Sequence, residues 1–161
     1  MGTAEISSME VDLSQVPLRP IGLKQVRELE IALVIASIFR KEVFDEILKP
    51  SDFTTWLDSL AIAAGALARE KAGYPIAKIA EELGRSESTI RNHLQGKTKA
   101  GKIVRETYDT LRREGGRIKL YIPLAPSISE ELEKLKTKLK DLEERMSKAR
   151  SLIEEAAQLL G

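Results

Sequence analysis

A heptad repeat near the C-terminal end of the chain limits its possible folds more than any other feature. Between residues 128 and 160, apolar residues follow one another at alternating steps of four and three. This spacing puts them on one side of a helix and is typical of a coiled coil. We therefore expect residues 127–161 to form a coiled-coil dimerisation helix. Its seam would contain Ile128, Leu132, Leu135, Leu139, Leu142, Met146, Ala149, Ile153, Ala156 and Leu160.

The residues beside this seam leave the arrangement of the helices open. In a parallel dimer they would form two attractive pairs and one repulsive pair, namely Glu131 with Lys136, Lys138 with Glu143, and Arg145 with Arg150. These charges favour parallel pairing weakly and leave antiparallel pairing open. Leu152 and Leu159 widen the apolar face near the end, which favours extra helices packing there, such as the predicted helix over residues 23–48. The alternative is a single helix that lies back on its own domain.

The second feature is the stretch IAKIAEELGRSESTIRNHLQ, residues 76–95. It predicts two short helices around a tight turn. Ile76, Ile79, Ala80 and Leu83 form one apolar stripe, and Gly84 follows where a positive φ is expected. Ser86 is expected to cap a second helix, residues 86–95, which would bury Ile90 and Leu94.

The opposite face of that second helix carries residue types that read base edges in DNA. Arg can donate two hydrogen bonds to guanine, and Asn or Gln can pair with adenine. We expect bases to be contacted by Ser88, Arg91, Asn92 and Gln95, and phosphates by Lys97, Lys99 and Lys102. Arg85, Ser86 and Thr89 complete the predicted DNA-binding set. The alternative is a helical hairpin within an unrelated core.

Residues 76–94 resemble the helix-turn-helix of bacterial and archaeal transcription regulators and sigma-type factors. The resemblance rests on Ile79, Ala80, Leu83, Gly84 and Ile90 and covers about 20 residues. Two positions depart from the pattern, since Arg85 and His93 stand where apolar residues are usual. The layout, with its trailing coiled coil, is similar to predicted archaeal helix-turn-helix regulators. The resemblance implies DNA binding, and no particular ligand or operator.

Positive charge is concentrated around this motif. The whole chain has a net charge of +1, but residues 76–126 hold 11 Lys+Arg against 6 Asp+Glu. A local basic patch is typical of proteins that bind the phosphate backbone. Ordinary fluctuation of charge along the chain is the alternative explanation.

The rest of the chain is expected to support this motif. Residues 1–50 would contain an irregular arm, with a short strand near residues 11–13, and a long apolar helix over 23–48 that could dimerise. A helix over 52–71 would begin the DNA-binding domain, residues 51–124. A further helix over 102–114 would close it, and a strand over 117–124 would follow. That strand would pair with the N-terminal arm as a wing beside the DNA, or with its own copy.

The expected fold is therefore mostly α: a helix-turn-helix multi-helix domain with a minor β element and a long C-terminal coiled-coil helix. No catalytic set, metal-ligand cluster or phosphate-binding loop is identifiable, so no enzyme activity, cofactor or metal is expected. The chain has no Cys and no signal or membrane-spanning segment, which fits a cytoplasmic protein. The expected partners are double-stranded DNA and a second copy of the chain, or more copies in a higher oligomer. Two alternatives are a coiled-coil interaction adaptor and an architectural, non-specific DNA-binding protein.

Overall fold

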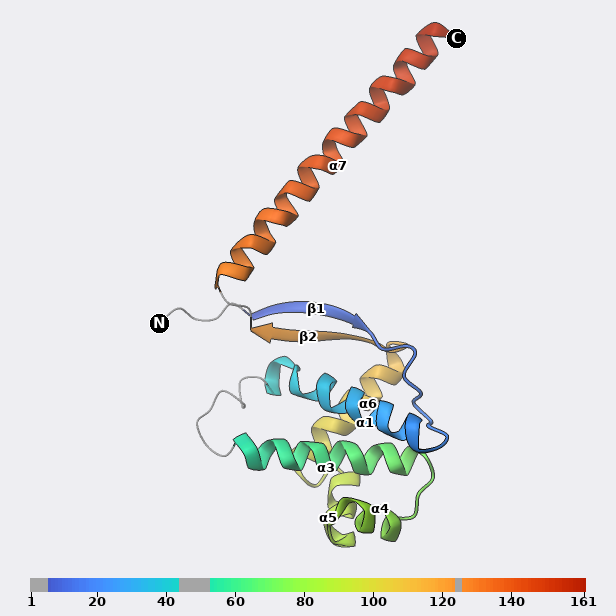
Figure 1. The fold of residues 1–161 in the computed structure, drawn as a ribbon, viewed down its shortest axis with the longest axis vertical. Helices are drawn as coiled ribbons and strands as arrows, with labels where there is room; N and C mark the ends of the chain where they lie inside the picture. Colours follow the sequence, from blue (N-terminus) through green and yellow to red (C-terminus); the bar gives the residue numbers. More distant parts are fainter. Residues whose placement is uncertain (1–5, 44–52, 124–125) are drawn as a thin grey trace. The chain divides into compact units, whose positions relative to one another are not determined.

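A computed structural model describes residues 6–43, 53–123 and 126–161. It is mostly helical, with one two-stranded sheet and a long C-terminal helix, as the sequence predicted at that level (Figure 1). The chain divides into two compact units. One unit is Ser8–Ile122, and the other contains the C-terminal helix.

Five helices of the first unit are fully described, and a two-stranded sheet accompanies them. The helices are α1 (Leu23–Ile38), α3 (Phe53–Lys71), α4 (Ile76–Leu83), α5 (Glu87–Leu94) and α6 (Lys99–Arg113). The strands are β1 (Ile6–Asp12) and β2 (Arg117–Pro123), whose arrows run in opposite directions in Figure 1.

Helices α1, α3 and α6 pack around the main core. Leu29 and Leu33 of α1, Leu60 of α3 and Leu111 of α6 are almost completely buried there. The buried face of α3 is lined by four alanines, so neighbouring helices can approach it closely. These alanines are Ala63, Ala64, Ala66 and Ala68. A smaller apolar cluster of Ala66, Ile79, Ala80 and Ile90 joins α3 to α4 and α5.

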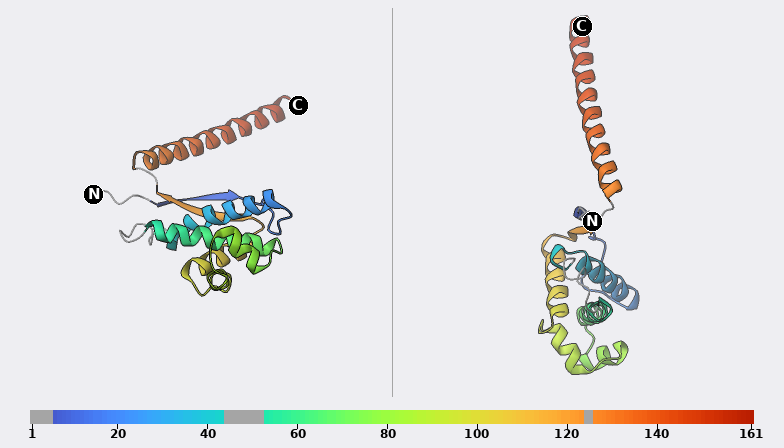
Figure 2. Two further views of the ribbon diagram at one scale, coloured as in Figure 1. Left: turned by 60° about the horizontal axis from the view of Figure 1, so that its bottom comes forward. Right: turned by 90° about the vertical axis from the view of Figure 1, so that its left-hand side faces the viewer.

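The sheet covers the side of this core that is opposite to α4 and α5 (Figures 1 and 2). Strand β2 alternates as predicted, with Ile118 and Leu120 buried and Arg117 and Lys119 exposed. Its partner is the N-terminal arm, one of the two alternatives that the sequence left open. The strand in that arm starts at Ile6, well before the predicted residues 11–13.

The prediction of one continuous helix over residues 23–48 is wrong. Helix α1 ends at Ile38, and helical structure resumes only at Lys41. The physical reason is a tertiary contact, because the carbonyl oxygen of Phe39 accepts a hydrogen bond from the backbone N–H of Tyr121 in β2, at 2.7 Å. Residues 44–48 of the predicted helix lie outside the described residues.

Within the described residues, the apolar middle of α1 is covered on one side only. Val26, Leu29 and Leu33 are fully buried, whereas Ile31 and Ile35 are 51% and 43% exposed. The side of α1 that carries Ile31 and Ile35 therefore stays open to solvent in the part of the chain that the structure describes.

Helix α6 starts three residues earlier than the predicted position 102. The side chain of Thr98 caps it, because its Oγ1 accepts a hydrogen bond from the N–H of Gly101 at 3.0 Å. Lys99 therefore lies in the first turn of the helix rather than in the preceding loop, and Lys102 lies inside the helix instead of at its start. Gly101 is buried, and a Cβ at this position would lie 2.2 Å from the carbonyl oxygen of His93.

His93 packs inside this junction between α5 and α6. The residue is 7% exposed, and its Nδ1 lies 2.7 Å from Oγ1 of Thr98. Leu94 is half-buried and touches both apolar clusters. His93 and Leu94 thus share the packing contacts that an apolar side chain at position 93 would make alone. Burial lowers the pKa of His93, and the nearby charge of Arg85 lowers it further.

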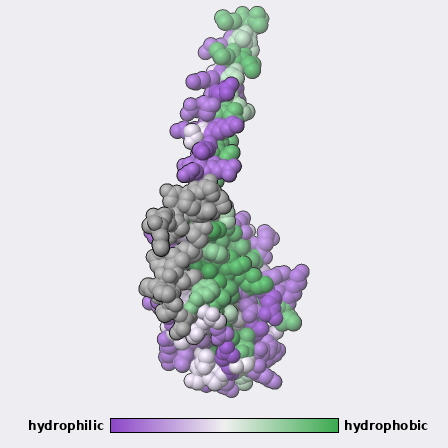
Figure 3. All heavy atoms as spheres, turned by 60° about the vertical axis from the view of Figure 1, so that its left-hand side comes forward, coloured by the Kyte–Doolittle hydropathy of each residue, from purple (hydrophilic) through white to green (hydrophobic). Residues whose placement is uncertain are grey.

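The C-terminal helix α7 (Pro126–Leu160) has 35 residues. Its side chains are described from residue 130 onward, and all of them are exposed in the single chain. Figure 3 shows apolar atoms along one side of α7. The seam residues among the exposed large side chains are Leu132, Leu135, Leu139, Leu142, Met146, Ile153 and Leu160. The side chain of Ile128 lies outside the described residues.

None of the helices in the described part of the chain has the length and apolar character needed to cross a membrane.

Gly101→Ala should lower the free energy of unfolding by about 2 kcal/mol or more, because the added methyl group meets rigid backbone at His93. Urea unfolding would measure this loss. Arg112→Ala, on the exposed face of the same helix, is the control and should change the unfolding midpoint little. A stable Gly101→Ala variant would contradict the close packing of α5 on α6.

The folded protein should lose stability when the pH falls from 7.5 to 5.5. The unfolded chain protonates His93 near pH 6.5, whereas the folded chain resists protonation until a lower pH. Unfolding therefore becomes more favourable as the pH falls through about 6.5, and the loss stops growing below the folded pKa. His93→Gln should abolish this pH dependence in urea unfolding, whatever its effect at pH 7.5. An equal pH dependence in both proteins would contradict the assignment.

Candidate nucleic-acid interface

Helices α4 and α5 form a compact pair joined by a tight turn. Gly84 has the predicted positive φ of 61°. The N–H of Gly84 bonds to the carbonyl of Glu81, and the N–H of Arg85 bonds to that of Ala80, which is the Schellman pattern of helix ends. The predicted cap is also present, since Oγ of Ser86 accepts a hydrogen bond from the N–H of Thr89 at 3.1 Å. The direction of α5 is thus fixed at its first residue.

A buried cation holds this pair on the core. Arg69 of α3 has a side chain that is 5% exposed, and its Nε lies 2.8 Å from Oε2 of Glu82 in α4. Its Nη1 lies 3.5 Å from Oε2 of Glu30 in α1 and donates to the carbonyl of Gly65. Three helices therefore meet at one guanidinium group.

The exposed face of α5 carries the residues that the sequence predicted for base contacts. Ser88, Arg91 and Gln95 are exposed and Asn92 is half-buried, whereas Ile90 on the opposite face is fully buried. All ten residues of the predicted DNA-binding set reach the surface at least partly. The structure brings them together on α5, its two ends and the start of α6.

Two arginines of that set already have acidic partners. Nη2 of Arg91 lies 2.8 Å from Oε2 of Glu87, one turn earlier in α5. Both side chains are about half exposed, and pairs of this kind contribute only about 0.3–0.5 kcal/mol. Such a pair separates at little cost when a stronger ligand arrives.

Arg85 connects the turn to α3. Its Nη2 lies 2.9 and 3.1 Å from the two carboxylate oxygens of Asp58. This contact explains the departure at position 85, since the arginine lies at the surface instead of in the core. A contact of Arg85 with DNA would have to compete with Asp58.

The stretch after α5 places cations beside it. Lys97, Lys99 and Lys102 lie at the surface near the N-terminal end of α6. Sequence reasoning missed Arg105, which donates from Nη1 to the carbonyl of Leu94 at 3.0 Å and passes close to Gly96. No local spacing signals this contact, because it spans eleven residues.

The basic residues of the sheet side are separate from this group. Arg117 and Lys119 lie on β2, across the core from α5 (Figures 1 and 2). The structure therefore places the predicted wing on the side of the core opposite α5, where β2 pairs with β1. Residues 76–105 alone hold 7 Lys+Arg against 3 Asp+Glu, so most of the excess charge stays with α4, α5 and the start of α6.

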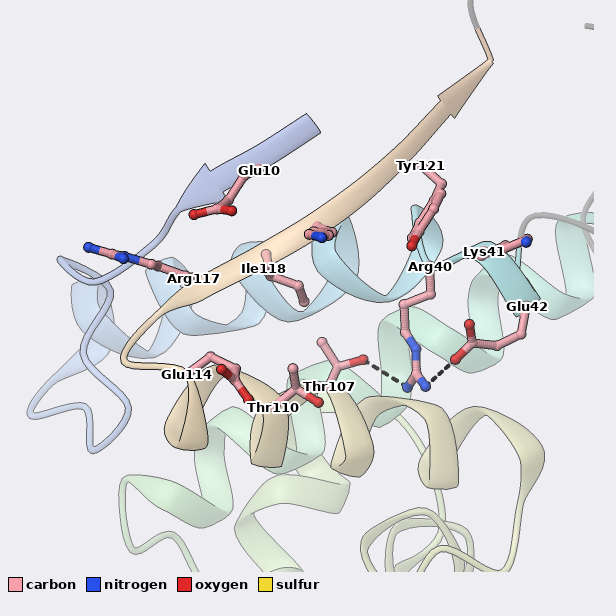
Figure 4. Close-up of a pocket in the computed structure, with 11 residues that line it drawn as sticks. Glu10, Arg40, Lys41, Glu42, Thr107, Thr110, Glu114, Arg117, Ile118 and Tyr121 are labelled. Atoms are coloured by element: carbon pink, nitrogen blue, oxygen red, sulfur yellow. Dashed lines mark hydrogen bonds and ion pairs between the residues drawn. The ribbon is translucent and has the colours of Figure 1, made fainter. Parts of the chain in front are cut away.

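A pocket of about 610 Å³ lies on the sheet side, between β2, α6 and the end of α1 (Figure 4). Its lining mixes charges of both signs, including Arg40, Arg117, Glu42 and Glu114. Arg40 pairs with Glu42 and donates to the carbonyl of Ile103, so its guanidinium is already engaged. Within the described ranges, no group of three or more His, Cys, Asp or Glu could hold a metal ion.

Comparison with known proteins identifies a relative of this chain. No protein-family model matches the chain, and no solved structure matches it. The chain is 50% identical over 131 residues to the uncharacterized protein MJ1053 of Methanocaldococcus jannaschii, and the match covers 80% of each chain. The chain therefore belongs to the same family as MJ1053.

Proposed function

We propose that this protein binds double-stranded DNA sequence-specifically, as a dimeric transcription regulator. In this proposal α4, the Gly84 turn and α5 act as a helix-turn-helix, and α5 enters the major groove. The observation that carries it is the polar face of α5, where Ser88, Arg91, Asn92 and Gln95 lie opposite the buried Ile90.

The dimensions of α5 suit this role. An α-helix with its side chains is about 10–12 Å in diameter, and the major groove of B-DNA is about 12 Å wide, so α5 can lie in the groove. The ends of the helix are fixed by the Ser86 cap and by contacts with the start of α6, so its exposed side chains start from defined positions. Fixed starting positions reduce the entropy lost on binding.

The surrounding charge suits phosphate contacts. Lys97, Lys99 and Lys102 follow α5 directly, and Arg105 lies beside them. Cations at these positions would position the protein on the duplex, whereas the α5 side chains would read the bases. A protein that bound DNA only architecturally would use the same cations without a preferred sequence.

The proposed dimer rests on the exposed apolar stripe of α7. This stripe is exposed along the whole described helix and has coiled-coil spacing. A coiled coil would cover this stripe and give the protein two copies of α5, as the pseudo-palindromic operators of helix-turn-helix dimers require. An adaptor protein would use the same stripe to recruit a different chain, and α5 would then have no duplex to bind.

Selection of bound sequences from a pool of random duplexes tests the proposal directly. We expect enriched sites with two related half-sites, spaced about 34 Å or a multiple of that distance. Binding without any enriched sequence would favour the architectural alternative. Absence of duplex binding even at low salt would favour the adaptor.

Arg91→Ala should weaken binding to the selected site by about 1–3 kcal/mol and relax the preference at one base position. Glu87→Gln should act in the opposite direction on affinity, because it releases Arg91 and removes a negative charge from the interface. Fluorescence anisotropy titrations with the selected and a scrambled duplex would measure both effects. Unchanged affinity and base preference in Arg91→Ala would refute its assignment as a base-reading residue.

The salt dependence of binding should identify the face that meets the phosphates. Lys97→Gln should reduce the slope of log K against log salt by about 0.9 for each phosphate that the protein no longer neutralises. Lys119→Gln is a matched control, since it removes the same charge from the sheet on the opposite side of the core. Equal changes of slope in both variants would contradict a binding face centred on α5.

A further inference from the structure

Helix α7 leaves a continuous apolar stripe uncovered. Leu135 and Leu139 are 58% and 59% exposed, and Met146, Ile153 and Leu160 are 72%, 69% and 89% exposed. The opposite side of the helix is strongly polar (Figure 3). Exposed apolar surface of this extent marks an interaction site.

We infer that α7 pairs with α7 of a second copy of this chain as a parallel, in-register, two-stranded coiled coil. This inference deepens the proposed function and rests on its dimer. It adds the orientation of the two helices and therefore the placement of the two DNA-binding units.

The residues beside the seam complement one another in the parallel arrangement. With leucines 132 and 139 at position a, each g residue faces the e residue five positions later on the partner helix. Glu131 then faces Lys136, and Lys138 faces Glu143, and symmetry makes each pair twice. Leu152 faces Ala157, so the apolar residues outside the seam also meet each other. The like-charge pair of Arg145 with Arg150 is the one unfavourable match.

The antiparallel arrangement that covers the whole stripe has no favourable charge pair. There, g residues face g residues and e residues face e residues. Lys136 meets Arg150, while Glu143 and Arg145 each meet their own copy. Leu152 meets Lys138, so an apolar side chain lies against a charged one. Flanking charges of this kind set the orientation of coiled coils.

The core residues alone do not decide between the two arrangements. Ala149 and Ala156 would fit opposite leucines in an antiparallel pair. Sliding that pair by one heptad in one direction would bring Glu143 opposite Arg150, but it would leave Leu132 uncovered at each end. Sliding it in the other direction would bring Lys136 opposite Glu143, but it would also bring Lys138 opposite Arg145 and leave Leu160 uncovered. The parallel pair covers the full stripe and makes more attractive than repulsive pairs at its sides.

The orientation matters for DNA binding. The chain passes from β2, which ends at Pro123, to α7, which starts at Pro126. A parallel coiled coil therefore attaches both DNA-binding units at the same end. An antiparallel one would separate the attachment points by the length of α7, roughly 50 Å at 1.5 Å per residue. Attachment at one end lets both copies of α5 reach one duplex.

Single cysteines test the orientation, because the chain contains no Cys of its own. Leu135→Cys and Ile153→Cys would each be treated with a short bifunctional thiol crosslinker. Each variant alone should give a covalent dimer, and a mixture of differently tagged variants should give no crosslink between 135 and 153. Two results would overturn the inference if identical positions also gave no crosslink. One is a crosslink between 135 and 153, and the other is a crosslink between 135 and a Leu160→Cys variant. A monomer in sedimentation equilibrium at micromolar concentration would also overturn it.

A charge variant gives an independent test without cysteines. Arg145→Glu turns two repulsive pairs into attractive ones in the parallel dimer, so the Kd for dimerisation should fall about fivefold. Lys138→Glu should raise it by a similar factor, because Glu143 then faces a like charge. In the antiparallel pair that covers the whole stripe, Arg145→Glu creates no attractive partner, and an unchanged or raised Kd would contradict the parallel arrangement. Neither variant touches α5, so a failure of DNA binding with a confirmed parallel dimer would refute the proposed function and leave this inference standing.

Discussion

The guanidinium group of Arg69 is the contact on which the placement of α5 depends. It pairs with Glu82 of α4 and Glu30 of α1, and it donates to the carbonyl of Gly65 in its own helix. A buried cation without these partners would be strongly unfavourable, and so the three helices must keep this arrangement. Gly65 provides the space that these ion pairs need, because a Cβ there would lie 2.7 Å from a carboxylate oxygen of Glu30 and 3.2 Å from Arg69.

The unit Ser8–Ile122, in which Arg69 holds α4 on α1 and α3, has two chemically different sides. On one side α5 presents polar side chains, with lysines at the start of α6 beside them. On the other side the sheet presents charges of both signs around a pocket whose Arg40 is already paired. The excess of positive charge lies mainly with the first side, where phosphate binding is proposed.

Much of the local structure could be predicted from the sequence, because its causes are local. The positive φ of Gly84, the Ser86 cap and the burial of Ile79 and Ile90 follow from side chains within a few residues of one another. The wrong predictions concern contacts between distant residues. The end of α1 depends on a bond from Tyr121 to Phe39, and the early start of α6 accompanies its packing on His93.

The sequence by itself determined the helical class, the α4–α5 pair and the heptad stripe of α7, since periodic apolar spacing and turn residues specify such elements without a partner. Only the tertiary structure decided that β2 pairs with β1 on the side opposite α5, and that Arg69 and Arg85 connect α3 to the α4–α5 pair. These outcomes depend on which residues meet after the core has formed, because ion pairs and strand pairing between distant segments leave no periodic signal along the chain.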